Sequence, residues 1–291
     1  MVITKKYLVF PVSDFVKVRE IDFYSKDKLL DDIYIKLDYI NPKYNIYYPV
    51  EKYKGLNIDV IIHPDINFRW DQTDEPDYTF VYNCPFRPKL HFTAAFGWLN
   101  DPNGLFEYTS KVTGEKVYNM YFQYNPYGNI GGNIHWGHAV SKDLLHWELK
   151  SSVMAPDELC MIFSGSAVVD SENRSGLKSG EEDVILIYYT AAGGTNKLSE
   201  NKKFTQCIAY SNDCGKTFVK YKENPIIQNV GNDNRDPKVV WCEEMQCYVM
   251  ALYLKEGTSS FGIFTSRDLL HWEFLQEMVI DGDAECPDLY P

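Results

Sequence analysis

The amino-acid sequence predicts an all-β protein, and three of its features support this fold class. Aromatic residues make up 15% of the 291 residues, with 22 Tyr and 16 Phe, and aromatic side chains pack well on the pleated surface of a sheet. Short segments that alternate apolar and polar residues fill the first 85 positions. From residue 86 onward, a pattern of strand-like runs and polar turns repeats along the chain.

Residues 1–85 are predicted to form a small N-terminal β-sandwich and its linker. Their alternating segments are separated by polar, proline or glycine breaks, as is typical of such a fold, and span residues 6–12, 16–24, 31–40 and 56–64. The stretch 69–88 is acidic and interrupted by prolines. We therefore interpret it as the linker into a second domain.

The second domain, residues 86–291, contains a repeated unit. The segment "SKDLLHW" at Ser141 recurs as "SRDLLHW" at Ser266, and a looser copy, "SNDCGKTF", starts at Ser211. Each copy follows two strand-like runs, of which the first is the more apolar. A strand with a polar head precedes these runs in each unit, and these heads read "WLNDPNGLFEY", "FSGSAVVD" and "RDPKVVW".

Four-stranded units that repeat in this way predict a β-propeller, in which the first strand of each blade lines a central channel. The sequence contains about three such blades and the first strand of a fourth, at "ECPDLYP". Blades bury their faces against neighbouring blades, and propellers normally close into a ring. We therefore expect residues 86–291 to form a truncated propeller.

The composition excludes several classes of function. The formal net charge is −12, which would repel a nucleic acid. No apolar run approaches the length of a membrane helix, and the first residues contain no apolar core of a signal peptide. The chain as given is expected to be cytoplasmic, and an extracellular location stays open if its N-terminus is incomplete.

We expect neither a metal nor a cofactor. The seven cysteines are scattered and odd in number, so reduced thiols are predicted, and Cys242 can approach Cys247 across a hairpin. His135 and His138 have the spacing of metal ligands but lack a matching second pair.

Three carboxylates, Asp101, Asp236 and Glu285, stand at the heads of predicted innermost strands, each close to a proline. Each alone has a plain structural explanation, since Asn-Asp-Pro and Asn-Gly favour turns and Asp236 can pair with Arg235. Ring geometry, however, would bring the three heads together at one end of the channel. Like charges held close and partly buried cannot all stay ionised, so we expect one carboxyl pKa to rise.

A carboxylate pair with split protonation is the machinery of glycoside hydrolysis, in which one group attacks the anomeric carbon and the other protonates the leaving oxygen. The acidic, aromatic-rich composition suits a neutral sugar. Trp98, Asn100 and Gln123 lie near the carboxylate motifs and are candidates for stacking and hydrogen-bond contacts with that sugar.

Six motifs occur in order along the chain: "WLNDPNG", "YFQYNP", "HWGHAVSKDLLHW", "FSGSAV", "RDPKV" and "ECPDLY". Together they resemble glycoside hydrolase family 32, the family of invertases, inulinases and levanases. Residues 1–85 resemble, more weakly, the small β-sandwich that precedes the catalytic domain of some levanase-like members. The resemblance implies a five-bladed propeller and a retaining hydrolase that cleaves β-fructofuranosyl linkages.

By matched position, the resemblance implies that Asp101 is the nucleophile that forms a fructosyl-enzyme intermediate. Glu285 would be the general acid and then the base, and Asp236 would bind sugar hydroxyls and stabilise the transition state. The positions matched to fructose binding are Asn100, Gln123, Phe163, Ser164 and Arg235. The implied partner is sucrose or a fructan such as levan or inulin.

The sequence departs from the family pattern at Gly131: it reads Gly131-Gly132-Asn133, where the family usually has Trp-Gly-Asn and the tryptophan walls the sugar pocket. Losing that ring costs on the order of 1 kcal/mol in binding. The truncation predicts that the chain alone is poorly active, because an open ring cannot hold Glu285 within about 5–5.5 Å of Asp101. Two alternatives stay open: a remnant propeller that only binds fructans, and transfer of the fructosyl group to a sugar.

Overall fold

The computed structural model describes residues 1–66, 68–78, 85–231, 233–254, 259–282 and 284–290. Within these ranges the regular secondary structure consists of β-strands and two short 3-10 helices, η1 (Glu51–Tyr53) and η3 (Lys197–Ser199). The all-β prediction is therefore confirmed. None of the helices in these ranges is long and apolar enough to cross a membrane.

The chain divides into two compact units. Unit 1 comprises Met1–Leu99, Tyr124–Asn133 and Asn196–Leu198, and unit 2 comprises Asn100–Gln123, Ile134–Thr195 and Ser199–Pro291. Two short segments from the middle of the chain thus belong with its N-terminal part. The sequence-based division into residues 1–85 and 86–291 stays a prediction about domains, whereas these units follow from packing.

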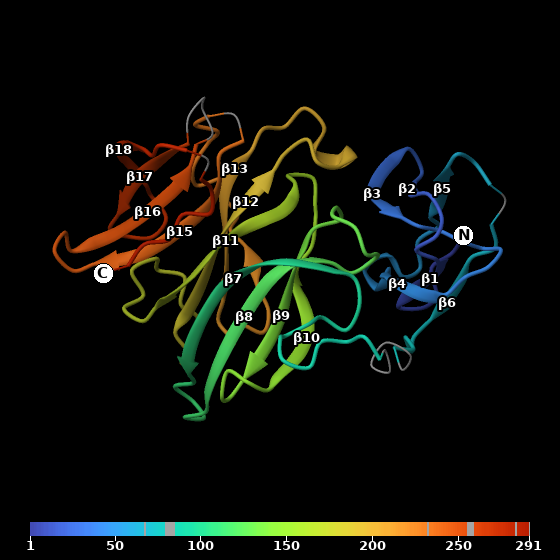
Figure 1. Ribbon diagram of the computed structural model, residues 1–291, viewed down its shortest axis with the longest axis horizontal. Helices are drawn as coiled ribbons and strands as arrows, with labels where there is room; N and C mark the ends of the chain where they lie inside the picture. Colours follow the sequence, from blue (N-terminus) through green and yellow to red (C-terminus); the bar gives the residue numbers. More distant parts are fainter. Residues whose placement is uncertain (67, 79–84, 232, 255–258, 283, 291) are drawn as a thin grey trace. The chain divides into compact units, whose positions relative to one another are not determined.

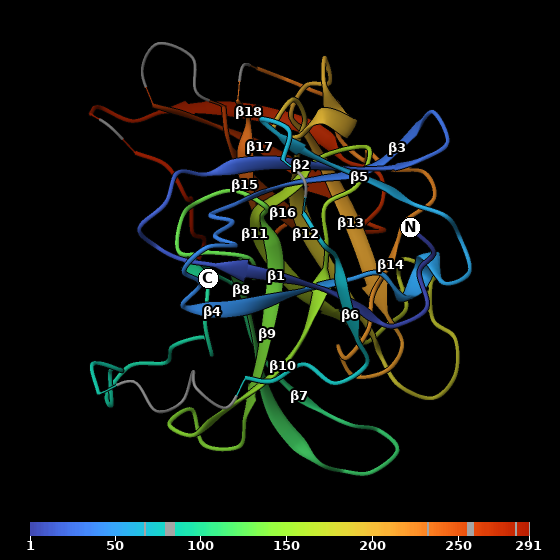
Figure 2. The ribbon, with the colours of Figure 1, turned by 90° about the vertical axis from the view of Figure 1, so that its right-hand side faces the viewer.

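Unit 1 contains two three-stranded sheets, with the strand orders β4-β1-β6 and β3-β2-β5 (Figures 1 and 2). The strands are β1 (Tyr7–Val12), β2 (Arg19–Ser25), β3 (Lys28–Ile35), β4 (Tyr44–Pro49), β5 (Asp59–His63) and β6 (Asp71–Thr73). Strand β6 lies inside the stretch predicted as a linker, and its Gln72 is paired with Leu8 of β1. Part of that stretch, residues 79–84, falls outside the described residues.

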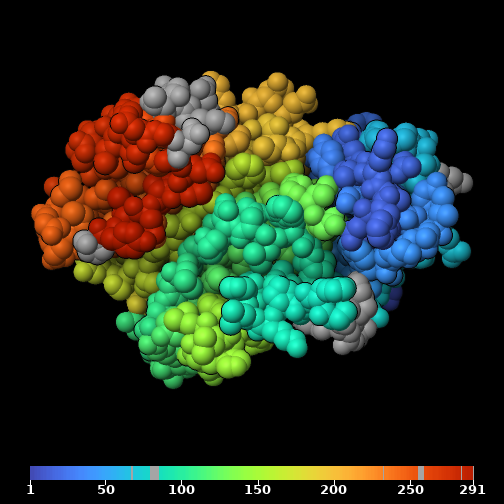
Figure 3. Space-filling model, viewed as in Figure 1, coloured from blue at the N-terminus to red at the C-terminus, as the bar shows by residue number. Residues whose placement is uncertain are grey.

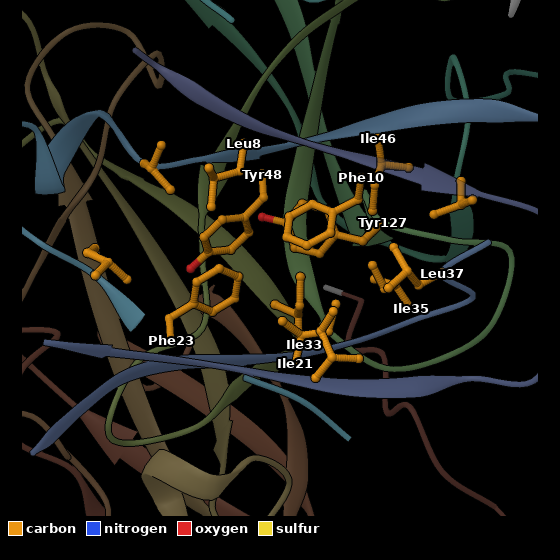
Figure 4. Close-up of a cluster of buried hydrophobic side chains, with 14 of the residues drawn as sticks. Leu8, Phe10, Ile21, Phe23, Ile33, Ile35, Leu37, Ile46, Tyr48 and Tyr127 are labelled. Atoms are coloured by element: carbon orange, nitrogen blue, oxygen red, sulfur yellow. The ribbon is translucent and has the colours of Figure 1, made fainter. Parts of the chain in front are cut away.

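Apolar side chains from both sheets fill the space between them (Figure 4). Phe23 and Tyr48 stack with ring centroids 4.3 Å apart, and Phe10 meets both rings edge-on. Strand β1 alternates half-buried and buried residues, as expected for a strand with one face in a core. Tyr127, from the Tyr124–Asn133 segment, belongs to the same core, so this segment folds as part of unit 1.

The Tyr124–Asn133 segment is also held by hydrogen bonds. The side-chain amide of Asn133 donates to the carbonyl oxygen of Tyr34 (2.8 Å) and accepts from the Tyr34 N–H (2.9 Å). Asn133 therefore satisfies both backbone groups of one residue of β3, in the way that a neighbouring strand would. We call this pair of hydrogen bonds the Asn133 bracket.

A cluster of charged side chains holds the Asn196–Leu198 segment in unit 1. The ammonium group of Lys197 contacts Glu20 and Asp22, and the Lys197 N–H donates to Asp32 (3.0 Å). Asp22 and Asp32 face each other across β2 and β3 and are almost fully buried. Burial raises the pKa of Asp32 to about 6. We call Glu20, Asp22, Asp32 and Lys197 the Lys197 cluster.

Unit 2 is built mainly of three four-stranded sheets in which the strands are adjacent in chain order (Figure 1). The first contains β7 (Trp98–Thr109), β8 (Lys116–Asn125), β9 (His135–Ser141) and β10 (Trp147–Met154). The second contains β11 (Met161–Asp170), β12 (Val184–Ala192), β13 (Thr205–Ser211) and β14 (Val219–Lys220). The third contains β15 (Arg235–Cys242), β16 (Cys247–Tyr253), β17 (Ser260–Ser266) and β18 (Glu273–Val279).

The second sheet is buried on both faces. Every residue of β12 is buried; Ile187 and Tyr189 join the core shared with β8 and β9, whereas Leu186 and Tyr188 join the core shared with β16. Alternate residues of a strand point to opposite faces. The continuous apolar run "VILIYY" therefore covers one neighbouring sheet on each side, as the blade interpretation requires.

The repeated Ser-x-Asp segments form one kind of turn between the third and fourth strands of a sheet. The Ser141 hydroxyl accepts the Leu144 N–H (2.9 Å), and Asp143 accepts the His146 N–H (2.8 Å). The copy that starts at Ser266 repeats both hydrogen bonds at the same distances. The sequence repeat is thus a structural repeat.

Two further expectations concern the end of the chain and the cysteines. Residues 284–290, drawn red at the surface in Figure 3, do not form the strand expected at Glu285, because they make no ladder with a neighbouring strand in the described part of the chain. Cys242 and Cys247 are opposite each other in the β15–β16 hairpin, as expected, and both are free thiols. Cys84 lies outside the described residues.

Candidate active site

The motif "WLNDPNG" forms part of a strand and not a turn. Strand β7 runs through the whole motif to Thr109. At Gly104, φ is +49° and a Cβ atom would come within 2.8 Å of the Ala167 Cβ atom of β11. Glycine therefore permits the close approach of two strands, and the turn explanation for this motif is wrong.

Asp101 is exposed on this part of β7 and is oriented by the neighbouring sheet. Its Oδ2 accepts a hydrogen bond from the Ser164 hydroxyl (2.7 Å), and Ser164 is buried on β11. A buried donor fixes the orientation of the carboxylate, while the exposed side chain stays within reach of a ligand.

Asp236 is buried at the start of β15. Its Oδ2 lies 3.5 Å from the Cys286 thiol, which donates to it, and 3.6 Å from Nε of Arg235. Burial raises the pKa of Asp236 to about 6, with smaller upward contributions from Asp101 and Glu285 and an opposing one from Arg235. The carboxyl pKa that rises is thus that of Asp236, and its cause is mainly desolvation.

Arg235 connects Asp236 and Glu285. Its guanidinium group binds Oε2 of Glu285, lies beside Asp236, and packs over the ring of Tyr253 at 4.7 Å. The side chain of Glu285 is 57% exposed, whereas that of Arg235 is 18% exposed. Arg235 therefore ties the exposed C-terminal segment to the head of β15, and the pairing of Arg235 with Asp236 expected from the sequence is present.

The other predicted sugar-binding residues lie near the same strand heads. Gln123 is buried and donates its side-chain amide to the Ile162 carbonyl (2.9 Å). Phe163 is half-buried and meets Phe204 edge-on at 5.6 Å. Asn100, half-buried, precedes Asp101 on β7. Trp98, which the sequence also suggested, is 41% exposed and belongs to unit 1.

Several polar residues of this region were not predicted. The strand-head pattern pointed to acids and missed Thr190, Gln206 and Asn234, all fully buried, and the thiol of Cys286. Their signal in the sequence is weak, because Thr190 interrupts an otherwise apolar strand and Gln206 lies near the start of one. A polar residue within a buried strand is the feature that would have identified Thr190 and Gln206.

Asp101 and Glu285 are exposed, whereas Asp236 is buried. Two hollows of about 470 and 480 Å³ lie elsewhere in unit 2, and none of the three carboxylates lines them. The first hollow is lined by Arg174 and Trp241, and the second by Arg267 and His271. Among the described residues, no group of three or more His, Cys, Asp or Glu side chains is placed to hold a metal.

Gly131, the departure from the family pattern, lies in the segment of unit 1 that ends at the Asn133 bracket. A Cβ atom at Gly131 would meet no atom within 4 Å. The backbone there therefore leaves room for a side chain, and the missing ring is not explained by local crowding.

Comparisons with known proteins agree with these motifs. The model of the glycosyl hydrolases family 32 N-terminal domain matches residues 91–291. The levanase of Bacillus subtilis is 42% identical over 215 residues, which cover 72% of this chain and 29% of the levanase. The invertase of Schizosaccharomyces pombe is 41% identical over 223 residues, with 72% and 36% covered.

Solved structures extend the similarity to the fold. The β-fructofuranosidase of Schwanniomyces occidentalis, complexed with fructosyl-erythritol, has a TM-score of 0.58 and 38% identity, with 66% of this chain and 36% of that chain covered. The exo-inulinase of Aspergillus awamori has a TM-score of 0.60 and 35% identity, with 68% and 40% covered. The chain thus spans about a third of the length of these curated relatives. It belongs to glycosyl hydrolase family 32.

Proposed function

We propose that the protein acts on β-fructofuranosyl linkages as a retaining hydrolase, with sucrose or a fructan as substrate. The observation that carries this proposal is the grouping of three carboxylates from separate parts of the chain. Asp236 and Glu285 lie against Arg235, and Asp101, held by Ser164, is near enough to Asp236 to raise its pKa. The names of the relatives support the substrate class, since they include a levanase, invertases and an exo-inulinase.

In the proposed reaction, the Asp101 carboxylate attacks the anomeric carbon while Glu285 gives a proton to the departing oxygen, which leaves as an alcohol. Water then attacks the fructosyl ester, Glu285 takes the water proton, and Asp101 is released. The Ser164 hydroxyl orients the nucleophile by binding one of its oxygens. Asp236, at the base of the cluster, would accept hydrogen bonds from sugar hydroxyls.

The ion pair between Arg235 and Glu285 bears on the acid role. In the structure the guanidinium group of Arg235 holds the Glu285 carboxyl group. Sugar hydroxyls that bind Arg235 would compete for this contact and release Glu285 toward the glycosidic oxygen. Substrate binding is therefore expected to reposition Glu285.

Fructose release from sucrose, inulin and levan by the purified chain tests the proposal. Asp101→Asn and Glu285→Gln should each abolish release without loss of folding, and Glu277→Gln, on the exposed strand β18, is the matched control. NMR of the first product should show the β-anomer; the α-anomer would overturn the retaining mechanism.

A chain that binds fructans but releases no fructose would support the second candidate, a binding-only propeller. Gly131, in place of the tryptophan that is usual in the family, favours that outcome. Methyl fructoside formed in the presence of methanol would show that the intermediate can be intercepted by an alcohol, as fructosyl transfer requires.

A further inference from the structure

The backbone of Asp236 adopts a conformation that requires support. Its φ angle is +62°, in the left-handed region that side chains other than glycine adopt uncommonly. Such conformations persist where the surrounding structure holds them, and they occur often at functional sites. At Asp236, the conformation places the carboxylate beside Arg235 and Cys286.

A chain of buried hydrogen bonds from the second sheet holds this backbone. The Asp236 N–H donates to Oγ1 of Thr190 (3.0 Å), and the Thr190 hydroxyl donates to Oε1 of Gln206 (2.8 Å). The side-chain amide of Gln206 then donates to the carbonyl oxygen of Asn234 (3.0 Å). This series of hydrogen bonds starts at the Asp236 N–H and ends at the Asn234 carbonyl oxygen. It therefore fixes both peptide groups that flank Arg235.

The register of the second sheet explains why these residues meet. Thr190 is opposite Phe163 of β11 on one side and opposite Gln206 of β13 on the other. Phe163, Thr190 and Gln206 therefore form one row across the sheet. This row connects Phe163, a predicted sugar contact, to the hydrogen bonds that hold the Asp236 backbone. Asn229 donates to the Asn234 side chain (2.8 Å) and fixes the far end of the network.

Thr190 and Gln206 are completely buried, and a buried polar group is costly unless its partners satisfy it. A valine at position 190 would fill the same volume in an otherwise apolar run. The Thr190 hydroxyl is therefore explained by its hydrogen bond with the Asp236 N–H, and not by the packing of the sheet.

We infer that Thr190 and Gln206 are positioning residues, which hold Arg235 and Asp236 in the geometry that the sugar site needs. This inference rests on the proposed function. It adds two residues that touch no substrate and act through the peptide backbone on either side of Arg235.

The test compares Thr190→Val, which keeps the shape and removes the hydroxyl, with Thr190→Ser, which keeps the hydroxyl. In Thr190→Val, kcat/KM on sucrose should fall by about tenfold to a hundredfold, the size of effect expected from a misplaced group, mainly through kcat. Thr190→Ser should recover most of this loss. Thr265→Val on β17 is the matched control, since Thr265 is distant in sequence and lies in the third sheet.

A second measurement does not depend on turnover. The titration of the Asp236 carboxyl group, followed by ¹³C NMR and identified by its absence in Asp236→Asn, should shift toward the ordinary range in Thr190→Val and stay unchanged in Thr190→Ser. If the parent releases no fructose, the proposed function fails and the titration still decides the inference. An Asp236 titration that is identical in the parent and Thr190→Val would overturn it.

Discussion

The two units each contain carboxylates gathered around a cation, yet the two clusters differ in what they leave accessible. In the Lys197 cluster, Asp22 and Asp32 are almost fully buried. Lys197 binds Asp22 through its ammonium group and Asp32 through its backbone N–H. In unit 2, we call Asp101, Arg235, Asp236 and Glu285 the Arg235 cluster. Its outer carboxylates, those of Asp101 and Glu285, are exposed.

Both clusters contain one aspartate whose pKa is raised to about 6 mainly by burial, Asp32 in unit 1 and Asp236 in unit 2. A raised pKa therefore does not by itself identify a site of chemistry. What distinguishes the Arg235 cluster is a buried acid next to exposed carboxylates that a ligand can reach. The predictions below test this difference, beginning with the largest expected effect.

Asp101→Asn and Asp22→Asn should have opposite consequences. Asp101→Asn should abolish fructose release and leave the unfolding midpoint unchanged, because its side chain is exposed. Asp22→Asn should lower the unfolding midpoint and leave fructose release in place, because it removes a partner of Lys197. Steady-state assays and urea unfolding of both variants check this pair, and loss of release in Asp22→Asn would contradict it.

Asp236→Asn should stabilise the protein at pH 7.5. The folded-state pKa of about 6 lies above the value of about 3.9 in an unfolded chain, so ionisation of Asp236 opposes folding above pH 6. The cost is at most about 3 kcal/mol, equivalent to two pKa units, and it disappears below about pH 4. Urea unfolding at pH 7.5 and pH 4 should show a gain only at the higher pH.

Lys197→Met should destabilise the chain by about 2 kcal/mol, less than the 3–5 kcal/mol expected for a fully buried pair, because the lysine side chain is 35% exposed. The loss arises because Glu20 and Asp22 keep their burial but lose their cation. Lys5→Met removes an exposed pair with Asp74 and should leave urea unfolding nearly unchanged. Equal effects of the two substitutions would contradict the role given to burial.

The smallest effect is expected for His63→Gln. His63 lies 3.0 Å from Asp22, and its side chain is 45% exposed, so the pair should contribute less than about 1 kcal/mol. A larger loss of unfolding free energy would show that His63, and not Lys197, is the main partner of Asp22.

Repetition and alternation in the sequence predicted much of this fold. The Ser-x-Asp repeats located equivalent turns, and the apolar run at Val184 was expected to be a strand; its burial on both faces came from the structure. The short strand β6 escaped prediction because three polar residues carry no alternation, and the strand expected at Glu285 found no ladder partner. Local patterns predict strands, but pairing decides which of them form.

Sequence motifs could name candidate side chains, but they could not show what the backbone does. Asp101, Asp236 and Glu285 were named from the predicted strand heads and the family resemblance, and their catalytic roles stay predictions. The left-handed conformation of Asp236 and its bond to Thr190 depend on residues 46 positions apart, which no local pattern connects. The assignment of the raised pKa to Asp236 likewise depends on burial, which only the packed structure defines.

The Asn133 bracket has a practical consequence for anyone who trims this protein. A gene cut at residue 86 would delete strand β3 and leave the amide of Asn133 and the ring of Tyr127 without their native surroundings. Water can replace the hydrogen bonds but not the apolar packing. Truncation at that point is therefore expected to yield material that aggregates, and a soluble propeller would require redesign of residues 124–133.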